Sequence, residues 1–139
     1  MNKLNLQKVV VAGIAGTLAF TLIMLMAPAM GLPKMDMGNM LGTMNPMVQL
    51  PYWMGWVMHF IIGIVLTGIY AAFFLNILPS NSWKHGLIWS LFPYILAQVM
   101  VMPIMGMGFF LGGNVGALVG SLLTHLGYGA VAGLAYADG

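Results

Sequence analysis

Two stretches of the sequence decide the fold: residues 59–71 read HFIIGIVLTGIYA, and residues 125–137 read HLGYGAVAGLAYA. Each stretch begins with a histidine, carries a glycine four residues later and closes with Tyr-Ala. A spacing of polar, small and aromatic residues that recurs inside very apolar segments indicates an internal duplication. We therefore expect His59 and His125 at equivalent places in the two halves of a membrane protein.

The composition excludes several classes of protein. Of 139 residues, 61% are hydrophobic and only 4% are charged, whereas soluble domains carry roughly 25% charged residues. The outer surface must therefore face lipid. The chain has no cysteine, which excludes disulfides and thiolate metal sites. Its formal net charge of +2 comes from scattered lysines without any arginine, so nucleic acid is not an expected partner.

Four apolar stretches are long enough to cross a bilayer, which takes roughly 20 residues per helix. In lipid, only helices and closed barrels satisfy the backbone hydrogen bonds, and apolar runs of this length are helices. We predict an all-α, four-transmembrane-helix bundle that forms one integral membrane domain over residues 1–139. The predicted spans are residues 9–30, 52–78, 85–107 and 114–136.

The lysines predict the orientation of these spans. With the N-terminus in the cytoplasm, Lys3, Lys8 and Lys84 lie inside and only Lys34 lies outside, as the positive-inside tendency favours. The first apolar stretch exceeds the roughly 7–15 residues of a signal-peptide core, so we expect it to be retained. The prediction is a multi-pass protein of the bacterial inner membrane with both termini in the cytoplasm.

The first and third predicted spans end alike. Residues 27–31 read APAMG and residues 102–106 read MPIMG, and proline bends or ends a helix. The chain therefore reads as two related helix pairs. Because each pair contains an even number of spans, we expect a pseudo-two-fold axis along the membrane normal, with both histidines at a similar depth in the outer leaflet.

The outer loop at residues 31–51 is rich in methionine. Pro33 and Asp36 suit the first turn of a short helix, where negative charge is favoured. We expect this helix to lie on the membrane surface, with Met37 and Met40 on its apolar face.

Small and aromatic residues predict how the spans pack and where they end. Glycines that recur every four residues let helix backbones approach closely in lipid. They mark the last span as the most tightly enclosed one, or as a docking face for a larger partner protein. The aromatic residues suit the belts at the two membrane interfaces. The glycines are Gly112, Gly116, Gly120, Gly129 and Gly133. The aromatic residues are Tyr52, Trp53, Trp56, Trp83 and Trp89.

The two repeated histidines are the strongest candidate site. Imidazoles facing each other across the axis suit a haem iron, with Gly63 and Gly129 leaving room for the macrocycle. They also suit copper, together with thioethers such as Met58, Met102 or Met105. The alternative is that each histidine only forms hydrogen bonds between helices. The candidate cofactor-binding residues are His59, His125, Gly63 and Gly129.

The sequence also suggests roles for a methionine cluster, for Gln98 and for His85. Met35, Met37 and Met40 have the spacing that soft thioethers use for Cu(I), although methionine is also a common filler of apolar surfaces. Gln98, an amide near the middle of a span, is expected to pair with another helix. His85 is expected at the cytoplasmic interface. The candidate metal ligands are His59, His125, Met58, Met105, Met35, Met37 and Met40.

The chain lacks the residues that other membrane functions require. No Asp, Glu, Lys or Arg lies deep in a predicted span, so a carboxylate proton relay or a charged ion pathway has no components. No nucleophile is accompanied by a base and an orienting acid. We therefore predict that the chain is not an enzyme.

Short motifs resemble those of a known family. Residues 28–36 (PAMGLPKMD), the Met58-His59 pair and His125 followed by Tyr128-Gly129 resemble an uncharacterised family, a domain of unknown function found in small bacterial four-helix integral membrane proteins. The resemblance covers essentially the whole chain. It implies the architecture and carries no functional residues.

Three functional hypotheses follow from the sequence. The leading one is a non-enzymatic accessory or structural subunit of a larger membrane assembly, such as a respiratory complex, because little of the chain lies outside the bilayer. The alternative is a haem b or copper protein centred on His59 and His125, serving electron transfer or copper handling. A small pore or carrier for a neutral solute is the third. The expected partners are the lipid bilayer and other membrane subunits or further copies of the chain.

Overall fold

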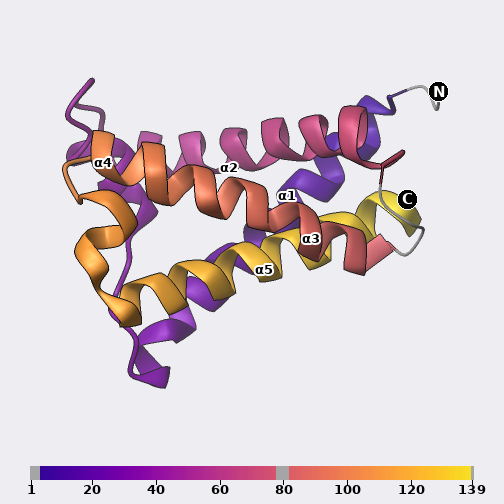
Figure 1. Ribbon diagram of the computed structural model, residues 1–139. Coiled ribbons are helices and arrows are strands. Elements are labelled where there is room, and N and C mark those ends of the chain that lie inside the picture. Colours follow the sequence, from indigo (N-terminus) through magenta and orange to yellow (C-terminus); the bar gives the residue numbers. More distant parts are fainter. Residues whose placement is uncertain (1–3, 78–81, 139) are drawn as a thin grey trace.

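The structure is a computed structural model that describes residues 4–77 and 82–138. These residues form helices and no strands, and four of the helical segments are long and apolar enough to cross a membrane (Figure 1). The elements are α1 (Leu6–Met26), η1 (Ala27–Met30), η2 (Asn39–Thr43), α2 (Tyr52–Ile69), η3 (Tyr70–Phe74), α3 (Ser82–Leu96), η4 (Ala97–Val101), α4 (Met102–Ile104), η5 (Phe109–Gly113) and α5 (Val115–Asp138).

The predicted helical fold is confirmed, and four helices long and apolar enough to cross a membrane lie where the four spans are predicted. The spans run over Leu6–Met30, Tyr52–Phe74, Trp83–Ile104 and Val115–Ala137 in the described part of the chain. They differ from the predicted bounds by a few residues, as expected for helix ends. The predicted end of the second span, residue 78, lies outside the described residues.

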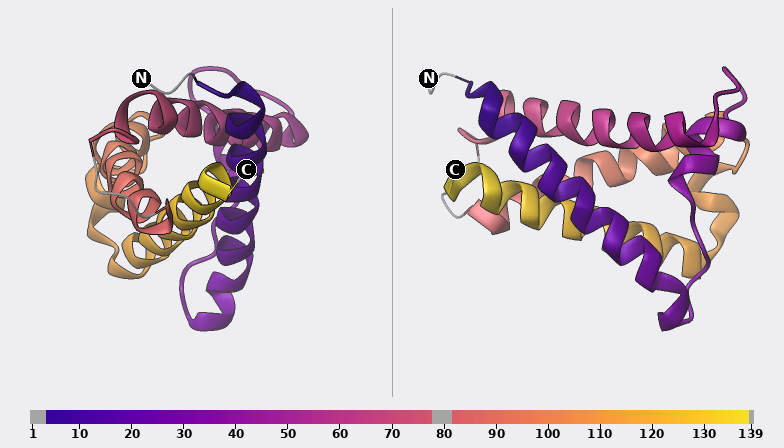
Figure 2. Two further views of the ribbon diagram at one scale, coloured as in Figure 1. Left: turned by 90° about the vertical axis from the view of Figure 1, so that its right-hand side faces the viewer. Right: turned by 180° about the vertical axis from the view of Figure 1, so that it is seen from behind.

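Helices α1 and α5 form the centre of the bundle. Helix α5 packs against both α1 and α3, and α2 packs against α1, whereas no comparable interface joins α2 to α3 among the described residues. The start of α1 and the end of α5 lie at one end of the bundle, and η2 and η5 lie at the other (Figures 1 and 2). The molecule therefore consists of two helix pairs that meet through α1 and α5.

The first and third spans end with the same backbone motif, as predicted. Gly31 and Gly106 both have a φ of 77°, a left-handed conformation that glycine adopts without steric cost. The N–H of Gly31 donates to the Pro28 carbonyl at 3.1 Å, and the N–H of Gly106 donates to the Pro103 carbonyl at 3.0 Å. Each proline is thus followed by the same helix cap.

Glycines let the helices of each pair touch. A Cβ added at Gly13 would lie 2.6 Å from the Cα of Ile64 on α2. A Cβ added at Gly129 would meet the carbonyl oxygen of Gly86 and lie 2.5 Å from the Cβ of Ser90, both on α3. Both interfaces therefore depend on the absence of a side chain, as in close helix packing in lipid.

Two further glycines of α5 also lie close to other parts of the protein. A Cβ at Gly116 would lie 3.1 Å from Pro33, and one at Gly127 would meet the side chain of Ile23. Gly112 does not belong to α5, because it lies in η5 with a φ of 64°, so the predicted glycine row is shorter by one residue. The suggested docking of α5 on a larger partner protein stays a prediction.

The outer loop does not lie flat on the membrane surface as predicted. Met37 and Met40 are buried in the bundle. The segment that carries them is held against the start of α2, where the backbones of Gly38 and Gly42 contact Gly55. Asp36 caps the short helix by accepting from the N–H of Asn39 at 3.2 Å. The apolar face of the helix therefore covers the interior and not the lipid surface.

Two residues predicted at the membrane interface have buried side chains. Trp89 is 2% exposed and stacks on Phe92 with a centroid separation of 5.4 Å and an interplanar angle of 22°. His85 is 5% exposed. The ring of Trp89 also lies 4.4 Å from that of Phe74, between centroids, so the end of the second span helps to cover it. Trp53 and Trp83 are exposed, as interfacial residues should be.

We predict that Gly129→Ala destabilises the protein by about 1–3 kcal/mol, because an added methyl group has no room beside Gly86 and Ser90. Thermal unfolding in detergent measures the effect. Gly68→Ala is the matched control, since its Cβ would lie 3.6 Å from Val9, an ordinary contact. Equal melting temperatures for the two variants would contradict the prediction.

Candidate functional site

The two repeated histidines line one cavity. His59 on α2 and His125 on α5 both contribute to a cavity of about 170 Å³. Its walls come from α1, α2, α3 and α5, with η2 and η4 at the outer-loop end. The cavity occupies the side of the bundle where α2 and α3 do not pack against each other.

Phe20 of α1 packs against both imidazoles. Its ring centroid lies 4.9 Å from that of His59 and 5.2 Å from that of His125, with interplanar angles of 66° and 72°. Both are edge-to-face contacts, which aromatic rings favour. The two histidines are therefore brought together in one cavity and share Phe20 as a neighbour.

His125 is held in one tautomer. Its Nδ1 lies 2.6 Å from the carbonyl oxygen of Ser121. Because a carbonyl only accepts hydrogen bonds, Nδ1 must carry the hydrogen, which leaves the lone pair on Nε2. Gln98 of η4 donates from Nε2 to the Ser121 hydroxyl oxygen at 3.0 Å. The predicted pairing of Gln98 with another helix is thus confirmed.

His59 is fixed less firmly. Its Nε2 lies 3.5 Å from the hydroxyl oxygen of Thr21, which itself donates to the Thr17 carbonyl at 2.8 Å. A contact of 3.5 Å is at the limit of a hydrogen bond. The ring position therefore depends mainly on packing against Phe20 and Trp56, whose centroid is 5.9 Å away.

Matching contacts surround the two histidines. Thr21 lies beside His59, and the ring of Tyr94 lies 5.6 Å from that of His125. Thr21 and Tyr94 each follow, by four residues, a side chain that contacts the repeated glycine of its own helix pair. The pseudo-two-fold axis itself stays a prediction.

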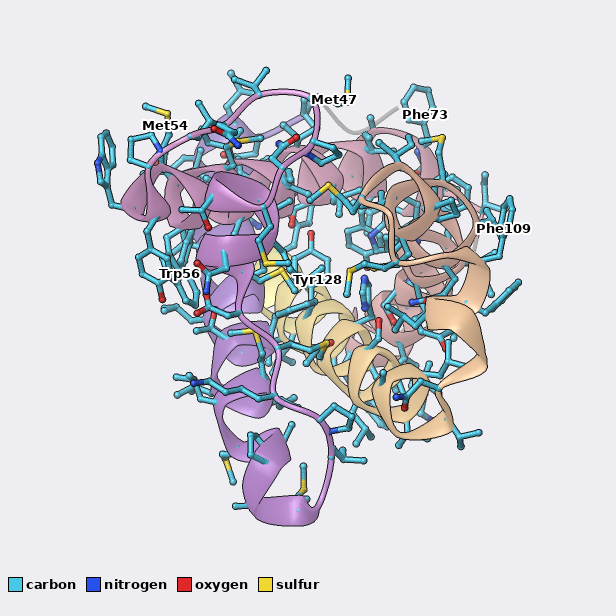
Figure 3. All side chains as sticks on the ribbon, turned by 90° about the vertical axis from the view of Figure 1, so that its left-hand side faces the viewer. Met47, Met54, Trp56, Phe73, Phe109 and Tyr128 are labelled. Atoms are coloured by element: carbon cyan, nitrogen blue, oxygen red, sulfur yellow. The ribbon has the colours of Figure 1, made fainter. Side chains whose placement is uncertain are left out.

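A second cavity adjoins the first at the outer-loop end. It has a volume of about 350 Å³. Sulfur atoms gather inside this end of the bundle around Tyr128, whereas Met47 and Met54 lie at its edge (Figure 3). Five residues line both cavities and so form a wall between them, which we call the shared wall. The shared wall consists of Phe20, Met37, Met40, Met102 and His125.

The sequence profile of a family of unknown function, DUF6789, matches residues 5–138. The chain belongs to this family. The resemblance seen in the sequence motifs is thereby confirmed. No curated protein sequence and no solved structure matches the chain. The chemistry of the site therefore has to be argued from its own residues.

The predicted metal ligands fall into three groups. Met37, Met40 and His125 belong to the shared wall, while His59 lines only the first cavity and Met35 only the second. Two predicted ligands line neither cavity. Those two are Met58 and Met105.

Two methionines complete the set of sulfur donors at the cavities. Met102, which the sequence suggests as a thioether near the histidines, belongs to the shared wall, and Met107 lines the second cavity. No sequence signal singles out Met107. Among the described residues, no three His, Asp or Glu side chains form a metal site.

The geometry does not favour haem. The first cavity, at about 170 Å³, is smaller than the roughly 300 Å³ at which sites for small organic ligands begin. Phe20 also fills the space beside both imidazoles. Gly63 and Gly129, expected to leave room for a macrocycle, are instead filled by close contacts with α1 and α3.

We predict that Tyr128→Phe destabilises the protein by about 1 kcal/mol, as found for hydrogen bonds between membrane helices. The hydroxyl group donates to the Gly63 carbonyl at 2.7 Å and lies 2.8 Å from the Thr67 hydroxyl oxygen. Thermal unfolding in detergent measures the loss. Tyr70→Phe is the control, because that buried hydroxyl group has no hydrogen-bond partner among the described residues. The prediction fails if both variants melt alike.

Proposed function

We propose that the protein is a non-enzymatic membrane protein that binds one Cu(I) ion at the shared wall. The single observation that carries this proposal is the composition of that wall. Three thioethers and one imidazole line the same boundary between two cavities: Met37, Met40, Met102 and His125. Thioethers favour soft ions such as Cu(I), and imidazole also binds copper.

The hydrogen bonding of His125 supports a role as ligand. Metal-binding histidines usually donate their second ring N–H to a carbonyl or carboxylate, which fixes the tautomer and the ring orientation. The bond from Nδ1 to the Ser121 carbonyl at 2.6 Å supplies this support and leaves Nε2 free to coordinate. Gln98 in turn bonds to the same serine, so two helices hold the ligand in place.

The charge of the site favours a monovalent ion. The shared wall contains no carboxylate, so a bound divalent ion would keep two uncompensated charges in apolar surroundings. An isolated buried charge is costly unless it is coordinated. Hard divalent ions also require oxygen ligands. A soft monovalent ion brings the smaller charge into the apolar site and does not require oxygen ligands.

The lysine distribution supports one orientation of the protein in the membrane. We infer an inner-membrane protein with the start of α1 and the end of α5 in the cytoplasm, because this orientation leaves only Lys34 outside. The two cavities then lie toward the outer leaflet, and the second cavity faces the outer side of the membrane.

Binding of Cu(I) is testable with purified protein under anaerobic conditions. Competition with the chelator bathocuproine disulfonate should show one bound ion per chain. His125→Ala and the triple variant Met37→Leu/Met40→Leu/Met102→Leu should each weaken binding by at least about tenfold, since even second-shell changes cost that much. X-ray absorption should show both sulfur and nitrogen neighbours.

The exposed methionines provide the control for this test. Met44→Leu/Met47→Leu should leave the affinity unchanged, because Met44 and Met47 are 66% and 77% exposed and line neither cavity. If methionine acts here only as an apolar filler, the wild-type protein and both sets of variants will compete equally poorly with the chelator.

A second role, as an accessory subunit of a larger membrane assembly, is supported by how little of the chain lies outside the four spans. The two roles are compatible, because a subunit that binds a metal can also be part of a larger assembly. Native mass spectrometry after extraction in mild detergent should show the chain together with other membrane subunits. A chain that runs alone as a stable monomer or self-dimer would contradict this second role.

A further inference from the structure

The second cavity connects the shared wall with the surface at the outer-loop end. Besides the shared wall, its lining includes residues that are exposed to solvent, such as Lys34 and Asn114. Met107 in the same lining is 40% exposed, and Met35 is partly buried. The lining therefore runs from the surface through Met107 and Met35 to the buried sulfur atoms of the shared wall.

We propose that Met35 and Met107 form a transfer site that accepts Cu(I) at the outer face and passes it to the shared wall. This inference rests on the proposed function. Each step is a ligand exchange in which one copper–sulfur bond forms as another breaks. Copper stays in the +1 state throughout, so no electron, proton or further reactant is required.

The composition of the second cavity supports this assignment. Outside the shared wall, Met35 and Met107 supply its soft donors, and they come from the two different outer loops. Lys34 carries the charge in this lining and is exposed, so its ammonium group is solvated while its stem covers apolar surface. A soft ion thus finds sulfur ligands before it reaches the buried site.

The backbone beside Met107 is strained. Phe110 and Leu111 have φ values of 48° and 52°, a left-handed conformation that costs a non-glycine residue about 1–3 kcal/mol. Leu111 lines the second cavity. Strain of this kind concentrates at ligand clamps, where the surrounding structure enforces it. The second outer loop is therefore held in a specific shape around the transfer site.

The test compares the rate of loading with the affinity at equilibrium. Purified protein in detergent is mixed with the coloured Cu(I)–bathocuproine disulfonate complex, and loss of colour reports both quantities. Met35→Leu/Met107→Leu should slow loading by at least about tenfold and leave the affinity of the shared wall unchanged. Met44→Leu/Met47→Leu is the matched control and should load at the wild-type rate.

Each other outcome overturns the inference in a distinguishable way. A normal rate with normal affinity shows that copper arrives by another route, while the site at the shared wall stands. A loss of affinity as large as that of His125→Ala assigns Met35 and Met107 to the binding site itself. A wild-type protein that takes up no Cu(I) rejects both proposals. Leucine preserves the volume of methionine, and thermal unfolding checks that each variant is folded.

Discussion

Close contact between glycine backbones is the constraint on which the rest of the structure depends. Lipid gives helices no hydrophobic reason to associate, so close packing and a few hydrogen bonds must hold them together. Gly13 meets α2, and Gly86 meets Gly129. His59 and His125 each precede a repeated glycine by four residues, about one helix turn. On each of these two helices, the face that makes the close contact therefore also carries the histidine. Both imidazoles thus point into the interior of the bundle.

The architecture could be predicted because its signals are local. Apolar length identifies the spans, and proline followed by glycine identifies two of their ends. The position of the outer loop could not be predicted, since methionines such as Met37 and Met40 suit a lipid surface and a protein interior equally. The same holds for Trp89, whose burial depends on its contacts with Tyr70 and Phe74 at the end of the second span.

The candidate site was only partly predictable, for a related reason. The repeated pattern identifies His59 and His125, because an imidazole in a membrane span is costly and recurs at the same spacing. The bond from His125 to Ser121 and the edge contacts of Phe20 depend on rotamers and on helix positions. Sequence spacing does not contain this information. Met107 joins the lining of the second cavity only because the chain turns back there.

Helices α2 and α3 have no close backbone contact on the flank of the first cavity, although the end of the second span packs on α3 through Phe74 and Trp89. Ile62 of α2 and Leu96 of α3 line the first cavity from helices that do not pack on each other. In a bilayer, any opening that the side chains leave along that flank is accessible to acyl chains, since a vacuum beside hydrocarbon forfeits dispersion energy. In the lipid surroundings that the four apolar helices suggest, the bilayer would thus bound the cavity on one flank and the polypeptide would bound it on the others.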